Sequence, residues 1–320
     1  MDRIENKPKI IEGNMLYLVV TMLLITVGSF AQRKNIFVGL LITEYIITLV
    51  PILLYLIIKK YNIKKVLRLN KLTKKEILLI PAITLLAYPI GAFLNSLMMI
   101  IISIFGELLE SPLPSPSSGG SYIIGLFVIA ITPGICEEFM FRGFLMRCYD
   151  NKGYKKAILI SSVLFGLMHF NIQNLLGPIF LGVLFGFLVY RTNSLFAGII
   201  GHITNNGFAW TLTYIISSSD IPMEQTEEVG MQISETMSII ISAVFLLAIA
   251  LVTGIFAYKL YKKLPNRQLE NLHMNNEENQ VEIIDDIDES KDIKINNIFK
   301  YMPVIVIMII YIYLHMILYI

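Results

Sequence analysis

The sequence predicts an all-α fold, a polytopic transmembrane helical bundle of eight or nine spans. Its 320 residues are 55% hydrophobic and only 16% charged, which is too apolar for an ordinary soluble domain. Apolar runs long enough to cross a bilayer core of about 30 Å recur between short polar breaks. Since backbone groups in lipid must be hydrogen-bonded within their own segment, these runs are expected to be helices.

Nine apolar segments define the expected spans, and the last is either a ninth span or a tail anchor. They cover residues 15–31, 36–58, 77–105, 123–146, 157–172, 174–190, 194–216, 237–260 and 301–320. The first segment ends in Ser29, Phe30 and Ala31, which resemble a signal-peptide cleavage site. We expect an uncleaved span, because acidic and basic residues are mixed in its leader and make a weak n-region.

The polar breaks divide the chain into four parts. These are a cytoplasmic N-terminus (1–14), a membrane-embedded domain (15–261), a polar cytoplasmic linker (262–299) and a C-terminal transmembrane helix (300–320). The linker is rich in acidic residues and is expected to be solvated, including His273. Residues 111–120, rich in Pro, Ser and Gly, predict an external loop without chemistry.

The basic residues predict the orientation of the chain. Loop 59–76 is rich in lysine, which places it in the cytoplasm by the positive-inside rule. Loops 106–122 and 217–236 contain no Lys or Arg, and alternation places both outside. The N-terminus is then cytoplasmic, and we expect an integral protein of the plasma membrane. Only Arg33 and Lys34, in a short turn, oppose the bias.

Three ionisable residues lie inside one apolar run. Placing Glu137, Glu138 and Arg142 in a membrane is costly unless they pair or face water. On a helix, Glu138 and Arg142 are four residues apart and can form an ion pair, whereas Glu137 points about 100° away. One carboxylate is therefore left unpaired. Pro133 and Gly134, one turn earlier, can kink the helix and expose Glu137 to a cavity.

Two further spans carry polar residues at a similar depth. Phe165 and His169 share a face of one predicted helix, and His202 and Asn206 share a face of another. Rises of about 1.5 Å per residue place Glu137, His169 and His202 roughly halfway through the membrane. Their convergence predicts a single polar site, with a cavity that opens toward the cytoplasm.

Simpler roles are open to several of these residues. In the simpler interpretation, Glu138 and Arg142 form an internal strut that orients the helix and have no catalytic role. Asn206 taken alone would form an ordinary hydrogen bond between helices. The chain has only two cysteines, Cys136 and Cys148, which offer no disulfide framework and no CxxC metal site. Cys136 is expected to be a small buried thiol rather than a nucleophile. Glu44 and His315 have no evident partners and are expected to pack or to line a cavity rim.

The motifs resemble those of a known family. Residues 137–142 fit EExxxR, residues 165–169 fit FxxxH and residues 202–206 fit HxxxN. This ordered set, within residues 120–215, resembles the CAAX protease and bacteriocin-processing (Abi) family of intramembrane endopeptidases, which is related to the type II CAAX prenyl endopeptidases. The first three spans, the linker and the final span match no family by their motifs.

The resemblance implies roles for individual residues. Glu137 would activate a water molecule with help from His169, while His202 and Asn206 would stabilise the oxyanion. Glu138, Arg142 and Phe165 would support them. The resemblance implies a peptidase but does not identify its substrate. We expect a membrane-associated peptide or a CAAX-like, membrane-anchored protein as substrate, and no cofactor. The bilayer is the other partner, and the net charge of +2 gives no nucleic-acid footprint.

Two alternatives stay open. Glu137, Glu138, His169 and His202 can instead bind a divalent metal such as zinc, which would make the protein a metallopeptidase. The absence of an HExxH motif and the nearby Arg142 favour the metal-free interpretation. The second alternative is a non-enzymatic transporter, scaffold or immunity protein, because buried polar groups are equally typical of transporters. No internal repeat supports a transporter.

Overall fold

The computed structural model describes residues 7–110, 113–219, 234–267 and 299–319. Within these ranges every regular element is a helix and no strand occurs, which confirms the predicted all-α polytopic class. Several segments for which the sequence made predictions lie outside the described residues. They are the start of the N-terminus (1–6), the acidic loop between 220 and 233, and the linker from 268 to 298 with His273.

The first two predicted spans are continuous helices that each contain a π-helical segment. Their elements are α1 (Ile10–Leu23), η1 (Leu24–Gly28), α2 (Ser29–Lys34), α3 (Ile36–Leu41), η2 (Ile42–Leu49) and α4 (Val50–Ile58). A short α5 (Ile63–Val66) follows in the basic loop. The third span is α6 (Lys74–Phe105), capped by a Thr73–Glu76 capping box and interrupted internally by Pro81 and Pro89.

The motif region is built from helices in the middle of the chain. The fourth span comprises α7 (Gly119–Gly125), η3 (Leu126–Ile131), α8 (Thr132–Glu138), η4 (Phe139–Leu145) and α9 (Met146–Cys148), followed by the 3-10 turn η5 (Asp150–Lys152). The remaining elements are α10 (Tyr154–Met168), α11 (Leu176–Thr192), α12 (Leu195–Ser218), α13 (Glu235–Lys262) and α16 (Met302–Tyr319). All nine predicted segments therefore coincide with helices.

Five helical stretches are long and apolar enough to cross a membrane. They are Ile10–Lys34, Ile36–Ile58, Lys74–Phe105, Gly119–Cys148 and Glu235–Lys262. Leu176–Thr192 and Met302–Ile317 are apolar but shorter. The predicted span 157–172 ends earlier than expected, because α10 stops at Met168 after 15 residues. Its length of about 22 Å is less than a bilayer core of about 30 Å.

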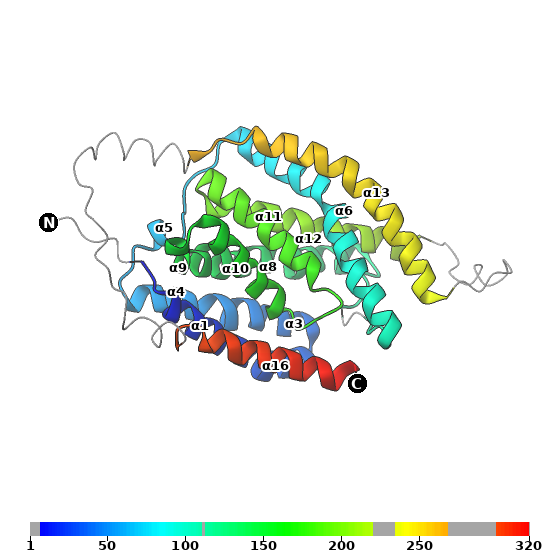
Figure 1. Ribbon diagram of the computed structural model, residues 1–320, viewed down its shortest axis with the longest axis horizontal. Helices are drawn as coiled ribbons and strands as arrows, with labels where there is room; N and C mark the ends of the chain where they lie inside the picture. Colours follow the sequence, from blue (N-terminus) through cyan, green and yellow to red (C-terminus); the bar gives the residue numbers. More distant parts are fainter. Residues whose placement is uncertain (1–6, 111–112, 220–233, 268–298, 320) are drawn as a thin grey trace.

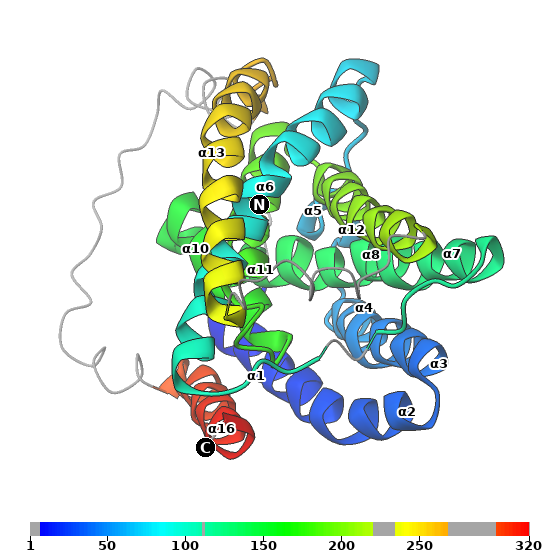
Figure 2. The same cartoon turned by 90° about the vertical axis from the view of Figure 1, so that its right-hand side faces the viewer.

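The helices form three groups around the motif region. α8 and α12 pack against each other in the centre, α6 packs on α11, α12 and α13, and α1 packs on α16. In Figures 1 and 2, α1 to α4 and α16 lie on one side of α8, and α6 and α13 lie on the other. Segments far apart in sequence therefore enclose the motif-bearing helices.

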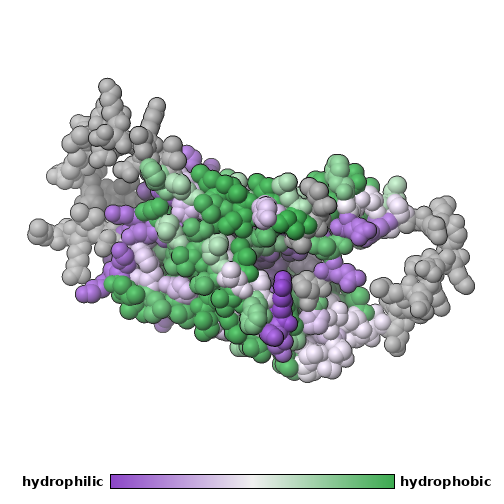
Figure 3. Space-filling view, turned by 90° about the horizontal axis from the view of Figure 1, so that it is seen from below, coloured by the Kyte–Doolittle hydropathy of each residue, from purple (hydrophilic) through white to green (hydrophobic). Residues whose placement is uncertain are grey.

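Apolar side chains cover much of the outer surface. On α13, only 11% of the most apolar window is buried, and its exposed residues include Phe245, Leu251 and Phe256. Figure 3 shows apolar residues over the middle of one face, with hydrophilic residues nearer its two ends. This distribution fits a protein whose middle is surrounded by lipid.

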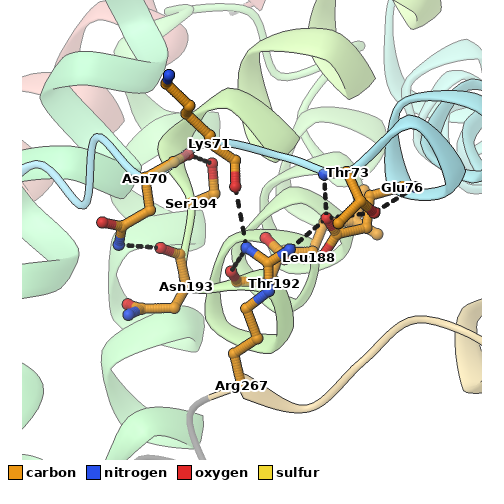
Figure 4. Close-up of polar contacts among 9 residues, drawn as sticks. All are labelled: Asn70, Lys71, Thr73, Glu76, Leu188, Thr192, Asn193, Ser194 and Arg267. Atoms are coloured by element: carbon orange, nitrogen blue, oxygen red, sulfur yellow. Dashed lines mark hydrogen bonds and ion pairs between the residues drawn. The ribbon is translucent and has the colours of Figure 1, made fainter.

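Hydrogen bonds join the connections at the lysine-rich end of the bundle (Figure 4). The Asn70 amide donates to the Asn193 carbonyl at 2.6 Å, and the Ser194 hydroxyl donates to the Asn70 carbonyl at 2.6 Å. Arg267, which follows α13, donates to the backbone carbonyl of Lys71 and pairs with Glu76. The loop before α6, the α11–α12 turn and the end of α13 thus share one end, as the predicted alternation requires.

A second ion pair lies at the same end. The guanidinium of Arg68 is buried and contacts the carboxylate of Asp150 at 2.8 Å, and Arg147 reaches the same carboxylate at 2.7 Å. Burial lowers the pKa of Arg68, and the Asp150 charge opposes that shift. This pair ties the basic loop to the turn between α9 and α10.

Candidate active site

A proline in α8 frees a backbone carbonyl that the site uses. Pro133 has no N–H, so it cannot donate to the carbonyl of Ile129, four residues earlier. The Asn206 side chain on α12 donates to that carbonyl at 3.0 Å instead. The bond links α12 to η3 at the start of the motif region. Pro133 therefore leaves the Ile129 carbonyl available to accept the hydrogen bond from Asn206.

The predicted ion pair between Glu138 and Arg142 is present and completely buried. Arg142 Nη1 contacts Glu138 Oε1 at 2.7 Å, and both side chains are 0% exposed. The same Glu138 oxygen lies 3.0 Å from Nδ1 of His202 on α12. Glu138 accordingly joins the EExxxR helix to the HxxxN helix, and it holds the His202 ring with Nδ1 toward the carboxylate.

Aromatic rings surround the Arg142 guanidinium. Its central carbon lies 4.2 Å from the ring centroid of Phe165, 5.6 Å from Phe185 and 5.9 Å from Phe141. The Nε and Nη2 atoms have no hydrogen-bond partner among the described residues, so these ring faces supply the compensating cation–π attraction. Phe165 thereby supports the site, as predicted, through Arg142 as well as through His169.

Two glycines allow α8 and α12 to approach each other closely. A Cβ atom on Gly134 would lie 2.5 Å from the Ile203 side chain, and one on Gly198 would lie 2.5 Å from Glu138 Oε2. Small residues at helix contacts in membranes permit such packing. Gly198 is thus the residue that leaves room for the Glu138 carboxylate against α12.

Glu137 occupies different surroundings from its neighbour. It is 7% exposed, and its Oε2 atom has no hydrogen-bond partner among the described residues. The closest basic atom is Nε2 of His202, at 3.7 Å. That distance is too long for a direct hydrogen bond but suits a shared water molecule. Glu137 thus has a longer polar contact than Glu138, whose ion pair with Arg142 is 2.7 Å.

His169 lies at the C-terminal cap of α10. Its Nδ1 is 2.9 Å from the carbonyl of Phe165. Because a carbonyl only accepts, Nδ1 carries a proton, and in the neutral ring Nε2 then keeps its lone pair. The Phe165 ring packs edge-on against the imidazole, with centroids 4.9 Å apart. The predicted shared face of Phe165 and His169 is confirmed.

The first of two cavities at the site has a volume of about 420 Å³. Its lining includes His169, His202, Asn205 and Asn206, with the aromatic rings of Tyr88, Phe165 and Trp210. It extends to Leu113, before α7, and to Thr213, near the last turns of α12. These residues lie away from the lysine-rich end. The sequence predicted a cavity that opens toward the lysine-rich side, whereas the described lining extends toward the opposite end.

The second cavity, of about 560 Å³, lies on the other side of α8. Glu137, His169 and Glu44 line it, and Gln32 and Arg33 add polar groups from α2. His169 borders both cavities. The two cavities consequently approach each other at the catalytic residues predicted from the sequence.

The structure brings the predicted residues together and adds others. Glu137, Glu138 and Arg142 adjoin His202, while His169 and Asn206 share the first cavity with it. Sequence analysis missed Asn205, whose amide donates to Asn206 Oδ1 at 3.1 Å. It also treated Glu44 as lacking a partner. The sequence did contain signals for both. Asn205 stands directly beside the motif residue Asn206, and Glu44 is an acidic residue within an apolar span.

The four alternative metal ligands predicted from the sequence can be located in this arrangement. Glu138 contacts Nη1 of Arg142 at 2.7 Å and Nδ1 of His202 at 3.0 Å. Within the described ranges, no three His, Cys, Asp or Glu side chains are grouped as metal ligands. Of the four, Glu138 is held by Arg142 and His202, Glu137 lies 3.7 Å from His202, and His169 borders both cavities.

These features define a class of protein: a polytopic helical membrane protein with a buried Glu–His–Asn site. Residues 119–208, which contain the whole site, match the family model described as type II CAAX prenyl endopeptidase Rce1-like. A relative from Bacillus subtilis (strain 168), named "Putative membrane peptidase YdiL", is 31% identical over 122 residues. That region is 38% of this chain and 46% of the relative, so under half of the relative's length is covered. No solved structure matches the chain.

Both matches support a membrane peptidase of the CAAX protease family. The resemblance found in the three motifs is therefore confirmed over the segment that forms the site. The helices before residue 119 and after residue 208 lie outside the family match.

Proposed function

We propose that this protein is an intramembrane endopeptidase that hydrolyses a peptide bond with a water molecule activated by Glu137. One observation carries the proposal. The Glu137 carboxylate is buried, its Oε2 atom accepts no hydrogen bond from the described residues, and it lies 3.7 Å from His202, which lines the first cavity. Glu138, one residue away, is neutralised by Arg142 and is not available as a base.

The reaction follows from these positions. Glu137 takes a proton from water while the water oxygen bonds to the carbonyl carbon and the C=O electron pair moves onto the carbonyl oxygen. When this tetrahedral species collapses, the C–N bond breaks and the proton on Glu137 passes to the leaving amine. General-base help of this kind accelerates hydrolysis by about 10² to 10⁴. The lone pair on His169 Nε2 assists by accepting a hydrogen bond from the water.

Donors for the developing oxyanion come from α12. The Asn206 amide nitrogen carries two hydrogens, and only one is used by the Ile129 carbonyl. The second can reach an oxygen bound in the first cavity. His202 donates from Nε2 only as an imidazolium, because its Nδ1 is directed to Glu138. Each such donor contributes about 10² to 10³ in rate.

The first cavity indicates the class of substrate. Amides and aromatic rings line it, among them Asn95, Asn174 and Trp210, and its described lining contains no Asp, Glu, Lys or Arg side chain. Such a surface suits the backbone and uncharged side chains of a peptide rather than an ionic ligand. We propose a membrane-associated peptide or a membrane-anchored, CAAX-like protein as substrate, which enters from the end opposite the basic loops.

A fluorogenic peptide library tests this function. The purified protein in liposomes should cleave a subset of peptides, and the Glu137→Gln protein, purified in parallel, should be inactive. Glu107→Gln, which changes an exposed carboxylate, should retain wild-type cleavage. Absence of cleavage in every wild-type reaction, or equal cleavage by Glu137→Gln, would contradict the proposal.

Metal dependence is tested with the same protein. We propose a mechanism without a metal, so a chelator should leave turnover unchanged. Stoichiometric metal in the wild type, measured by mass spectrometry and lost together with activity in His202→Ala, would replace this mechanism with that of a metallopeptidase.

A further inference from the structure

A second carboxyl group lies beside Glu137 and comes from outside the family match. Glu44 belongs to η2 in the second helical stretch, far before residues 119–208. It is only 8% exposed, and its Oε2 atom receives no hydrogen bond from any described residue. A buried acidic group without a basic partner in an apolar span requires a compensating interaction.

The partner of Glu44 is Glu137. The π-helical η2 packs against α8, and the two carboxyl groups lie close enough to interact electrostatically. Both line the second cavity together with His169. π-Helical segments occur frequently at functional sites, and here the segment carries Glu44 to the candidate base.

Charge repulsion determines the state of this pair. Two ionised carboxylates in contact away from bulk water repel each other strongly, so one of them holds a proton. The basic groups lie on the Glu137 side of the pair: His202 Nε2 is 3.7 Å from this carboxylate, and the Arg142 charge interacts with it. Glu44 faces Glu137 and the Cys136 thiol of α8. The described lining of their cavity adds His169 and Arg33, of which Arg33 belongs to α2 near the chain reversal.

We propose that Glu44 is a positioning residue for the reaction: its protonated carboxyl donates a hydrogen bond to one oxygen of Glu137 and leaves the other oxygen directed at the attacking water. This inference rests on the proposed peptidase function. The hydrogen bond fixes the rotamer of Glu137, and the proton on Glu44 keeps the pair at a single negative charge. Neither role brings Glu44 into contact with the substrate.

The test replaces Glu44 by a permanent donor and by a side chain without one. Glu44→Gln keeps the size and the N–H donor, and it should stay within about threefold of wild-type kcat. Glu44→Ala removes the donor and should lower kcat by about 10- to 100-fold, the usual range for a lost hydrogen bond to a charged group. KM should be unchanged in both, because the substrate does not contact this side chain. Thr48→Ala, at another residue lining the same cavity, is the matched control and should retain wild-type kcat.

The outcomes separate this inference from the proposed function. Wild-type kcat in Glu44→Ala, or equal losses in Glu44→Gln and Glu44→Ala, would overturn the positioning role, even where Glu137→Gln is inactive as the proposed function requires. If Glu44→Ala fails to fold, Glu44→Leu fills the space without a donor and takes its place. Inactivity of the wild type itself would count against the proposed function instead.

Discussion

The two sides of α8 carry adjacent glutamates in opposite surroundings. Toward α12, Glu138 is completely buried between Arg142 and His202, with every ionic neighbour within 3.0 Å. Toward η2, Glu137 faces a cavity and a second carboxyl group, and its contact with His202 on α12 is longer, at 3.7 Å. A helical step of about 100° thus separates a charge that holds helices together from a charge that is available for chemistry.

This contrast shows how a membrane protein can keep a reactive carboxylate in an apolar setting. Glu138 contacts both Arg142 and His202 directly and so holds these two side chains in place. Glu137 lies near both groups but contacts neither as closely as Glu138 does. The following predictions test whether the two glutamates are divided in this way.

The largest expected effect is on stability when Glu138 loses its charge. Glu138→Gln leaves Arg142 buried without its counterion, which should lower the free energy of unfolding by about 3–5 kcal/mol. Thermal unfolding in detergent measures this. The double variant Glu138→Gln/Arg142→Met removes the uncompensated charge and should recover part of the loss. Unchanged stability in Glu138→Gln would show that the pair is not structural.

The next largest effect concerns the oxyanion donors. His202→Ala and Asn206→Ala should each lower kcat by about 10² to 10³ with a smaller change in KM, since the donors act mainly in the transition state. The double variant should lose less than the product of the two factors, because both side chains serve one charge. Strictly multiplicative losses in steady-state kinetics would argue against a shared oxyanion.

A smaller effect is expected from crowding Glu138. Gly198→Ala places a Cβ about 2.5 Å from Glu138 Oε2, and overpacking of this kind costs about 1–3 kcal/mol. Both unfolding temperature and turnover should fall. Gly207→Ala on the same helix is the control, because its nearest neighbour would lie at 3.8 Å. Equal behaviour of the two variants would remove the proposed role of Gly198.

The smallest perturbation tests orientation without changing the site. Lys64→Cys and Ser218→Cys alter exposed residues at opposite ends of the bundle. In intact cells, a membrane-impermeant maleimide should label Ser218→Cys, and it should label Lys64→Cys only after permeabilisation. Labelling of both from the same side would refute the predicted topology.

Local geometry decided which parts of the site could be predicted from the sequence. The Glu138–Arg142 pair and the Phe165–His169 contact follow from helical spacing alone, and both are present. The meeting of Glu44 with Glu137 depends on how η2 packs against α8, which no spacing within one helix encodes. The direction of the first cavity depended on where α10 ends. The apolar run of α10 continues the helical pattern in the sequence beyond Met168, but the helix itself stops there.

The central claim is tested most directly by comparing turnover and stability in Glu137→Gln. The substitution keeps the shape and hydrogen-bonding capacity of the side chain but removes the base. Turnover of a cleaved peptide should fall by at least about 10² while the unfolding temperature stays at the wild-type value, the reverse of the stability loss in Glu138→Gln. Near-wild-type turnover in a folded Glu137→Gln protein would contradict the assignment of Glu137 as the base.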